Sequence, residues 1–422
     1  MQSKAAEVVA RCRQLAQITD VPGETTRLFL SKATRDAHKL LSQWMRAANL
    51  NVRTDDAGNL RGSRNGTRPT GPTLLLFSHI DTVPKAGPFD GCLGVVLSIA
   101  ILELLRDKPL PFSIELIAFS EEEGVRFSWP FWGSRAVVGD ISASDLERRD
   151  RDGETIASAL RDFGLSPSRI PRTCPLPQST FAALEVHIEQ GPVLEHEDQP
   201  IGVVDAIIGQ THLEFSFEGK SNHAGTTPMK LRRDALAAAA EWITEVERYA
   251  SSHKSLVATV GFIQVLPNAT NVIPGVVRLT LDIRHKDSRT RHRATNSLIQ
   301  CALACGMRRA VLVQSAILDE HPSVLMDPTI TQQLLEASSL VGTPARILSS
   351  GAGHDAMILA PHVPTALLFV RSPGGLSHHP DETVRESDVE AALRTVLTFV
   401  EHLTHELNTA RILVAETSRS QP

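Results

Sequence analysis

Metal-ligating side chains follow a short apolar segment near the start of the chain. His79 and Asp81 come directly after the apolar run at 74–77, and Asp90 lies in the loop that follows. An apolar run bounded by turn residues is typical of a buried strand in a parallel sheet, and open α/β sheets bind ligands at the carboxyl ends of such strands. One imidazole and two carboxylates suit a borderline-soft divalent metal. Because His-x-Asp after a strand is more often a simple hydrogen-bonded pair, the hypothesis needs further ligands.

Three further clusters supply candidate ligands, each at the end of another predicted strand or in the loop after it. Residues 121–124 read Glu-Glu-Glu-Gly, residues 185–192 surround His187, and residues 375–380 surround His378. A run of acidic residues is usually a solvated turn. This one lies between a buried strand and a glycine, and like charges confined together cost free energy unless a cation neutralises them. Each cluster alone is weak evidence, but four clusters at one edge of a sheet predict a metal centre.

The elements that must position these clusters follow two different orders along the chain. Up to about residue 210, and again after about residue 327, helices alternate with apolar strands, which implies a mixed, mostly parallel sheet with helices on both faces. Between them the order is strand, helix, strand, strand, helix, strand, as in ferredoxin-like α+β domains. We therefore expect an α/β catalytic domain formed by 1–210 and 327–422, with a second domain inserted at 211–326. The expected helices are 34–50, 93–105, 233–250, 287–306, 330–341 and 388–407, the expected strands are 74–78, 114–119, 181–186, 212–218, 257–265, 276–284, 310–318 and 366–370, and 166–177 is expected to be a loop.

The composition of the 422-residue chain is that of a soluble enzyme. A net charge of -5 provides no basic surface for nucleic acid and no polybasic membrane patch. The N-terminal residues lack the apolar core of a signal peptide, and the most apolar window, 92–105, is shorter than the ~20 residues that span a bilayer. The five scattered cysteines form no disulfide framework, and Cys301 and Cys305, one helical turn apart, are expected to be buried thiols. We expect a cytoplasmic enzyme with a small-molecule substrate and with neither a nucleic-acid nor a membrane partner.

Several short strings extend the pattern from about residue 20 to about residue 400. They are SHIDT at 78–82, FDG at 89–91, EEEG at 121–124, HIEQGP at 187–192, SNHAGTTPM at 221–229, NVIPG at 271–275, DIR at 282–284, SGAGHDA at 350–356 and SH at 377–378. With them the chain resembles the metal-dependent M20 amidohydrolase family, in its carbamoylase and allantoate-amidohydrolase branch. HIEQGP and NHAGTTPM separate this branch from the ordinary peptidases of the family.

The resemblance implies a binuclear metal centre. Its ligands would be His79, Asp90, Glu123, His187 and His378. Asp90 would bridge two divalent metal ions, which could be Zn, Mn, Co or Ni.

The resemblance also implies roles for acidic residues beside the ligands. Glu122 would be the general base that deprotonates the attacking water, and Asp81 would fix the tautomer of His79 through its second ring nitrogen. The choice between Glu122 and Glu123 depends on the family pattern, in which the glutamate next to the glycine binds metal. His379 stands where Asn is usual and is an alternative ligand.

Substrate contacts are implied for the inserted domain and for loops of the catalytic domain. Arg284 ends an alternating strand, and its guanidinium can hold a carboxylate bidentately, although an ordinary surface arginine is the commoner case. His223 resembles the catalytic residue that stabilises the oxyanion in the family. The expected substrate-binding residues are Gln190, Gln210, His223, Asn271, Arg284, Gly351 and Gly353.

The implied activity is hydrolysis of a ureido or related linear amide bond in a small carboxylate, with release of ammonia and carbon dioxide. Allantoate and N-carbamoyl-L-amino acids are the leading substrates, and Phe-Trp-Gly-Ser at 131–134 favours allantoate slightly. One alternative is an aminopeptidase or dipeptidase on the same scaffold. The other is a catalytically silent binding protein, which would have lost a ligand or the base. The inserted domain forms dimers in relatives, so a homodimer is expected.

Overall fold

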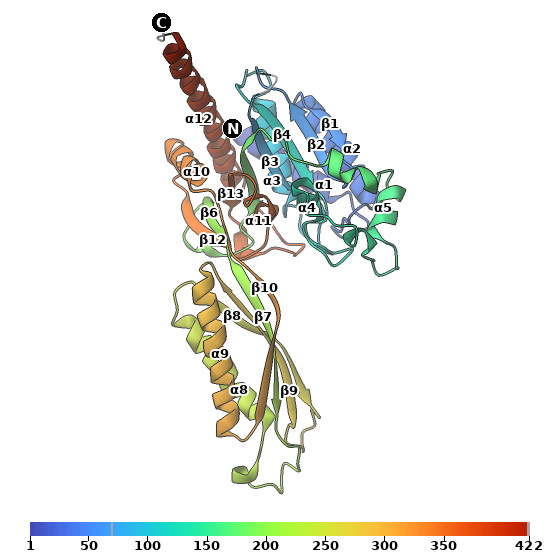
Figure 1. Cartoon of the computed structure of the whole chain (residues 1–422), viewed down its shortest axis with the longest axis vertical. Helices are drawn as coiled ribbons and strands as arrows, with labels where there is room; N and C mark the ends of the chain where they lie inside the picture. Colours follow the sequence, from blue (N-terminus) through green and yellow to red (C-terminus); the bar gives the residue numbers. More distant parts are fainter. Residues whose placement is uncertain (69–70, 420–422) are drawn as a thin grey trace. The chain divides into compact units, whose positions relative to one another are not determined.

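The computed structural model describes residues 1–68 and 71–419, with side chains described up to residue 409. Intramolecular contacts divide the chain into two compact units (Figure 1). The first unit consists of Met1–Asp205 together with Leu325–Pro422, and the second unit is Ala206–Val324. Along the chain, the second unit therefore interrupts the first.

The first unit contains a nine-stranded mixed sheet in the order β1-β2-β4-β3-β5-β13-β6-β11, with β12 paired to β6. At its centre, β4 (Ser113–Phe119), β3 (Thr73–His79), β5 (Thr180–Ile188) and β13 (Thr365–Val370) are parallel neighbours. These strands are almost entirely buried, which is why near-continuous apolar runs encode them. The mixed, mostly parallel α/β architecture is thereby confirmed. The remaining strands are β1 (Asn51–Thr54), β2 (Leu60–Arg64), β6 (Ile201–Ile207), β11 (Val324–Leu325) and β12 (Arg346–Ser350).

Helices pack against this sheet, with α3 on β3 and β5 and with α10 and α12 on β13. The helices of the first unit are α1 (Gln2–Ala16), α2 (Lys32–Ala47), α3 (Cys92–Leu104), α4 (Trp132–Val138), α5 (Ile156–Asp162), α6 (Ile170–Thr173), α7 (Val193–His196), α10 (Pro328–Leu340), α11 (Asp355–Leu359) and α12 (Glu386–Arg419).

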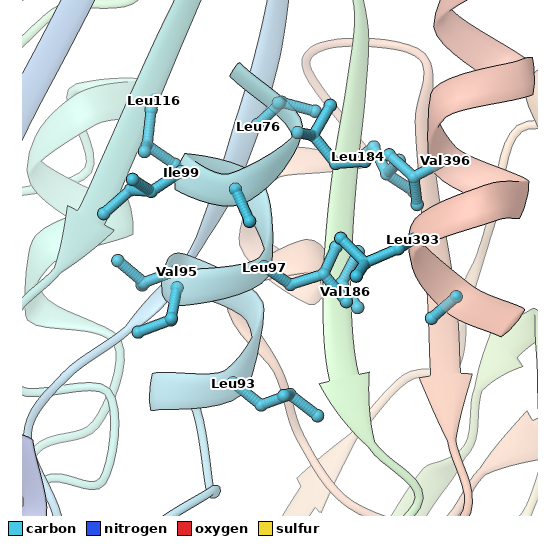
Figure 2. Packing of buried hydrophobic residues seen from close by; sticks show 14 of the residues in the cluster. Leu76, Leu93, Val95, Leu97, Ile99, Leu116, Leu184, Val186, Leu393 and Val396 are labelled. Atoms are coloured by element: carbon cyan, nitrogen blue, oxygen red, sulfur yellow. The ribbon is translucent and has the colours of Figure 1, made fainter. Parts of the chain in front are cut away.

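Helix α3 lies at the centre of the main hydrophobic core. Apart from Ser98 and Glu103, its side chains are apolar on every face, which is typical of a helix buried in a core. Leu97 of α3 lies beside Val186 of β5, and Leu393 of α12 belongs to the same cluster (Figure 2). Gly94 permits this packing, because a Cβ there would lie 1.9 Å from the backbone oxygen of Val186. Since α3 begins just after Asp90, its burial fixes the loop that carries this candidate ligand.

The segment 166–177, expected to be a loop, is partly helical. It contains a 3₁₀ turn at Pro167–Arg169 and the short helix α6. Both have proline in the first turn, where the missing N–H group costs nothing. The loop prediction was therefore wrong for residues 167–173, where Pro167 and Pro171 mark helix starts, whereas residues 175–177 have no regular secondary structure.

The second unit consists of one four-stranded antiparallel sheet and two helices. Phe215 and Phe217 on β7 pack against Trp242 on α8, whose indole N–H donates to the backbone oxygen of Leu298 on α9. These contacts form a hydrophobic core separate from that of the first unit. The elements in chain order are β7 (Gly209–Glu218), α8 (Ala235–Ser251), β8 (Val257–Leu266), β9 (Val276–His285), α9 (Ser288–Arg308) and β10 (Leu312–His321), and the sheet order is β10-β7-β9-β8.

All five cysteines are free thiols. Cys305 is buried as expected, but Cys301 is only partly buried, which corrects the expectation for this residue.

None of the helices in the described part of the chain is both long and apolar enough to cross a bilayer.

Candidate metal centre and active site

The candidate metal ligands lie at the carboxyl edge of the central parallel strands. His79 is the last residue of β3, and His187 lies near the end of the neighbouring β5. Glu123 follows β4, and His378 follows β13. Because these four strands are parallel neighbours, their carboxyl ends meet at one edge of the sheet. Asp90, in the loop before α3, is in contact with His187 and His378 there.

His79, His187 and Asp90 form a first group of ligand atoms. The Nε2 atoms of the two imidazoles are 3.3 Å apart, and Asp90 Oδ1 lies 3.2 Å from that of His187 and 3.7 Å from that of His79. The other ring nitrogens face backbone carbonyls, since His79 Nδ1 is 3.1 Å from the oxygen of Asp81 and His187 Nδ1 is 2.9 Å from that of Ile188. Carbonyls only accept, so in each neutral ring Nδ1 carries the hydrogen and Nε2 carries the lone pair. In this structure the lone pair of His187 accepts the backbone N–H of Gly91 at 3.2 Å. Two lone pairs and a carboxylate that converge in this way fit a divalent cation.

Asp90, Glu123 and His378 form a second group. His378 Nε2 lies 3.2 Å from Asp90 Oδ2 and 3.4 Å from Glu123 Oε1. Asp90 Oδ1 and Glu123 Oε1 are buried and have no hydrogen-bond partner among the described residues. Asp90 thus offers one carboxylate oxygen to each group, and the whole donor set fits a pair of cations.

The electrostatics of the site favour added positive charge. Burial favours the neutral form of His79, but Glu122 and Asp90 outweigh it and hold the pKa of His79 well above its usual value. The carboxylates of Asp90 and then of Glu123, which face its ring, raise the pKa of His378 to about 10. The carboxylates therefore draw protons onto the imidazoles. A bound metal would take the place of these protons, because metal binding requires neutral imidazoles.

Glu122 lies beside the first group, in the wall of a cavity of about 180 Å³. Its Oε2 is 3.9 Å from His79 Nε2, and its backbone oxygen accepts the N–H of Phe131. Burial, opposed by His79 and reinforced by Glu123, raises the pKa of Glu122 well above its usual value. A carboxylate with a raised pKa in the wall of a cavity is suited to take and return a proton. The cavity is lined by His79, Asp90, Glu122, Glu123, Pro130, Phe131, His187, Gln190, Ala352, Gly353 and His378.

Asp81 contacts the site differently from the expectation. Its backbone oxygen, and not its carboxylate, makes the short contact to His79 Nδ1, while Oδ1 lies 3.7 Å from that nitrogen. Its Oδ2 accepts the backbone N–H of Glu123 at 3.1 Å. The main chain at residue 81 therefore orients His79, and the buried carboxylate orients the backbone of Glu123.

Four residues at or beside the cavity that are not glycine adopt a left-handed backbone conformation. The φ angles are +54° at Glu121, +64° at Phe131, +57° at Gln190 and +55° at His378. Such conformations are unfavourable for residues other than glycine and cluster at functional sites.

Gln190 and Gly353 line the cavity, whereas Gly351 is exposed and is not among the lining residues. Gln190 Nε2 donates to Asp90 Oδ2 at 3.2 Å and to Ser377 Oγ at 3.1 Å. The amide of Gln190 is therefore engaged with a candidate ligand in this state. A Cβ on Gly353 would lie 2.8 Å from the ring of Phe131, so glycine keeps this wall open.

His223 and Asn271 belong to the second unit and lie on neighbouring segments. Both residues are exposed. Their segments are joined by the backbone, because the oxygen of Asn271 accepts the N–H of Ala224 and an antiparallel β-bridge pairs His223 with Val272. His223 Nδ1 accepts the backbone N–H groups of residues 225 and 226, at 3.0 and 3.2 Å. The neutral ring must then carry its hydrogen on Nε2, which makes it a donor.

Gln210 and Arg284 also belong to the second unit and are partners in the register of β7 and β9. Arg284 holds Asp282 along one edge, with Nε–Oδ1 at 3.0 Å and Nη2–Oδ2 at 2.8 Å. Asp282 also contacts His212 Nε2 at 2.9 Å. The guanidinium is thus already oriented by a carboxylate of its own strand.

Two polar residues of the site were missed by the sequence analysis. Ser377 Oγ donates to Asp90 Oδ2 at 3.1 Å, and the carboxylate of Glu382 accepts two backbone N–H groups of the Asp90 loop. Glu382 gave no signal because acidic residues in a polar segment are usually solvated. His379, the alternative ligand, is exposed, accepts the backbone N–H of Asp381, and lies outside both ligand groups described above.

Comparison with known proteins places the chain in a family. The model of Peptidase family M20/M25/M40 matches residues 75–402. The chain belongs to this family.

Within the family, the chain is similar to amidohydrolases. It is 38% identical over 381 residues to an N-carbamoyl-L-amino acid amidohydrolase of Geobacillus stearothermophilus, covering 90% of this chain and 93% of the relative. It is also 38% identical over 433 residues to a probable allantoate deiminase of Oryza sativa subsp. japonica, covering 94% and 88%. A solved amidase of the hydantoinase/carbamoylase family from Burkholderia multivorans matches with a TM-score of 0.88 and 32% identity, covering 94% of this chain and 97% of that one.

Proposed function

We propose that this chain is a binuclear metal-dependent amidohydrolase that cleaves the ureido bond of a small carboxylate. Allantoate and N-carbamoyl-L-amino acids are the leading substrates, as the names of the relatives suggest. The observation that carries the proposal is the pair of ligand groups that share Asp90, with Glu122 beside them in the cavity wall.

The ligands divide between two cation positions in this proposal. His79, His187 and Asp90 Oδ1 would hold one ion, and Glu123, His378 and Asp90 Oδ2 would hold the other. Zn, Mn, Co or Ni suits these nitrogen and oxygen donors. When bound, such an ion lowers the pKa of a coordinated water and polarises a substrate carbonyl.

Glu122 carries the proton in this mechanism. It takes a proton from the attacking water, and the oxygen of that water forms a bond to the ureido carbon. Glu122 then gives the proton to the nitrogen that joins the ureido group to the rest of the substrate, and the C–N bond breaks. The products are an amine and a carbamate, which decomposes to ammonia and carbon dioxide.

The second unit would supply the remaining substrate contacts. The donor tautomer of His223 suits stabilisation of the oxyanion, and Asn271 is its neighbour. Arg284, oriented by Asp282, would bind the substrate carboxylate, with Gln210 beside it. We also propose that this ferredoxin-like unit is a lid and the dimerisation domain of a homodimer, which a mass measurement in solution tests.

Two alternatives are not favoured. The amidohydrolase names of the relatives argue against an aminopeptidase or dipeptidase. A silent binding protein would lack a ligand or the base, whereas all five candidate ligands and Glu122 are present.

An ammonia-release screen of the purified protein tests the proposal. Allantoate and several N-carbamoyl-L-amino acids are assayed by ammonia release, and several dipeptides by release of free amino acids, all with added divalent metal. We expect ammonia from at least one ureido substrate and little cleavage of dipeptides. Hydrolysis of dipeptides alone would overturn the proposal.

A further inference from the structure

Two loops that carry candidate metal ligands are joined by one buried carboxylate. Glu382 lies four residues after His378, and only 4% of it is exposed. Its Oε1 accepts the backbone N–H of Phe89 at 2.8 Å and that of Asp90 at 3.0 Å. The loop after β13 is thereby bonded to the loop before α3.

The bonds from Glu382 act on the backbone of the ligand that both groups share. Asp90 must point Oδ1 toward His187 and Oδ2 toward His378, each at 3.2 Å. A small rotation of the Asp90 backbone would move both oxygens together. Because Glu382 fixes the N–H of Asp90 itself, it restricts this rotation directly.

The chain leaves space for this carboxylate at Gly87. A Cβ on Gly87 would lie 2.2 Å from Glu382 Cβ and 2.6 Å from Glu382 Oε1. No larger residue could stand at position 87 without displacing the carboxylate from Phe89 and Asp90. The Asp90 loop is therefore shaped around Glu382.

We propose that Glu382 is a positioning residue that sets the affinity of the metal centre by fixing Asp90 between the two cation positions. It contributes through the two hydrogen bonds that it accepts and does not itself bind metal. The inference rests on the proposed metal centre, but it does not depend on which substrate is hydrolysed. A purely structural role would instead lower stability and leave the metal affinity unchanged.

The test compares variants by direct metal binding. Affinity for Zn²⁺ is measured by competition with a chromophoric chelator, using stripped full-length protein. We expect Glu382→Ala to bind Zn²⁺ roughly 10- to 100-fold more weakly, as is usual when a hydrogen bond that orients a ligand is lost. The aspartate side chain of Glu382→Asp is too short to reach the loop, so this variant should lose a similar factor in Zn²⁺ affinity. It provides a second measurement if the alanine variant fails to fold. Glu382→Gln keeps an oxygen that can accept both bonds and should stay near wild type.

Asp327→Ala is the matched control. Asp327 Oδ1 also accepts two backbone N–H groups in the first unit, those of Thr329 and Ile330 at 2.9 and 3.0 Å, but it lies outside the ligand loops. Its loss should lower the thermal stability of the stripped protein without weakening Zn²⁺ binding.

The possible results separate this inference from the proposed function. Wild-type Zn²⁺ affinity in both Glu382→Ala and Glu382→Asp would overturn the inference. A loss in Glu382→Gln as large as in Glu382→Ala would also overturn it, because charge and not the accepted bonds would then matter. Wild-type protein that binds no Zn²⁺ would overturn the inference and the metal centre together. Wild-type protein that binds Zn²⁺ but releases no ammonia would overturn the proposed function alone.

Discussion

At the scale of residues, the site is organised by backbone contacts that leave its ligand atoms facing one another. His79 and His187 each direct Nδ1 at a main-chain carbonyl, so both Nε2 atoms face Asp90. The four clusters that contain the candidate ligands were predictable because metal-ligating residue types follow buried apolar strands, whereas the choice of five ligands within these clusters depends on the family resemblance. The use of the Asp81 carbonyl in place of its carboxylate was not, because a sequence does not distinguish main-chain from side-chain contacts.

Substitutions of the adjacent residues Glu122 and Glu123 are predicted to change different properties of the enzyme, the rate for Glu122 and the metal content for Glu123. Glu122→Gln removes the proton carrier and should retain metal, while the rate falls roughly 10²- to 10⁴-fold. Glu123→Gln removes the carboxylate that faces His378 and should lose metal. Elemental analysis beside kcat on each variant separates the two effects. Metal loss in the Glu122 variant with retention in the Glu123 variant would mean that the two roles are exchanged.

Arg284 is predicted to bind the substrate carboxylate. Arg284→Ala should raise KM sharply for acidic substrates and much less for the matching amides, with unchanged metal content. Arg284→Lys should also raise KM, because lysine cannot reproduce the planar fork that Asp282 orients. Arg278→Ala, an exposed arginine on the same strand, is the control for charge alone. An unaltered KM in Arg284→Ala would show that Arg284 does not bind the substrate, and another residue would then have to bind the carboxylate.

At the scale of elements, the buried parallel strands and most of the long helices were predictable, whereas helix α1, strand β6 and the short strands β1 and β2 were not. Apolar runs predicted β3, β4, β5 and β13 because both faces of each strand are covered. Strands β1 and β2 were missed because they are short, largely polar and pair antiparallel. Their formation depends on the strands that they pair with, and the local sequence does not encode that pairing.

Helix α2 carries a buried histidine that is predicted to make stability depend on pH. Burial, and then the charges of Arg27 and Arg35, lower the pKa of His38 from 6.5 to about 4. The folded state therefore resists protonation of a group that the unfolded state protonates below pH 6.5. This contribution to the free energy of unfolding amounts to roughly 3 kcal/mol. It is present above pH 6.5 and is lost as the pH falls toward 4.

Replacement of His38 by Phe should remove this dependence, since a phenyl ring can still pack on Phe163. Free energies of unfolding from urea titrations at pH 8, 6, 5 and 4 should fall less steeply in the variant than in the wild type. Parallel curves for the two proteins would show that His38 does not titrate on unfolding in this range.

At the scale of the whole molecule, the candidate site residues are divided between two units with separate cores. The candidate ligands and Glu122 all belong to the first unit, whereas His223, Asn271 and Arg284 belong to the second. The change in element order along the chain predicted two kinds of domain. How the polar residues of the second unit meet a substrate could not be predicted, because that depends on contacts far apart in the sequence.

The central claim is that two cations, held by ligand groups that share Asp90, are needed for hydrolysis of a ureido bond. The most direct measurement is ammonia release and metal content in the same preparation, after stripping with a chelator and stepwise return of Mn²⁺ or Zn²⁺. The account predicts no turnover in the stripped protein and a return of activity that saturates at two ions per chain. Full activity in a preparation shown to be free of metal would contradict it.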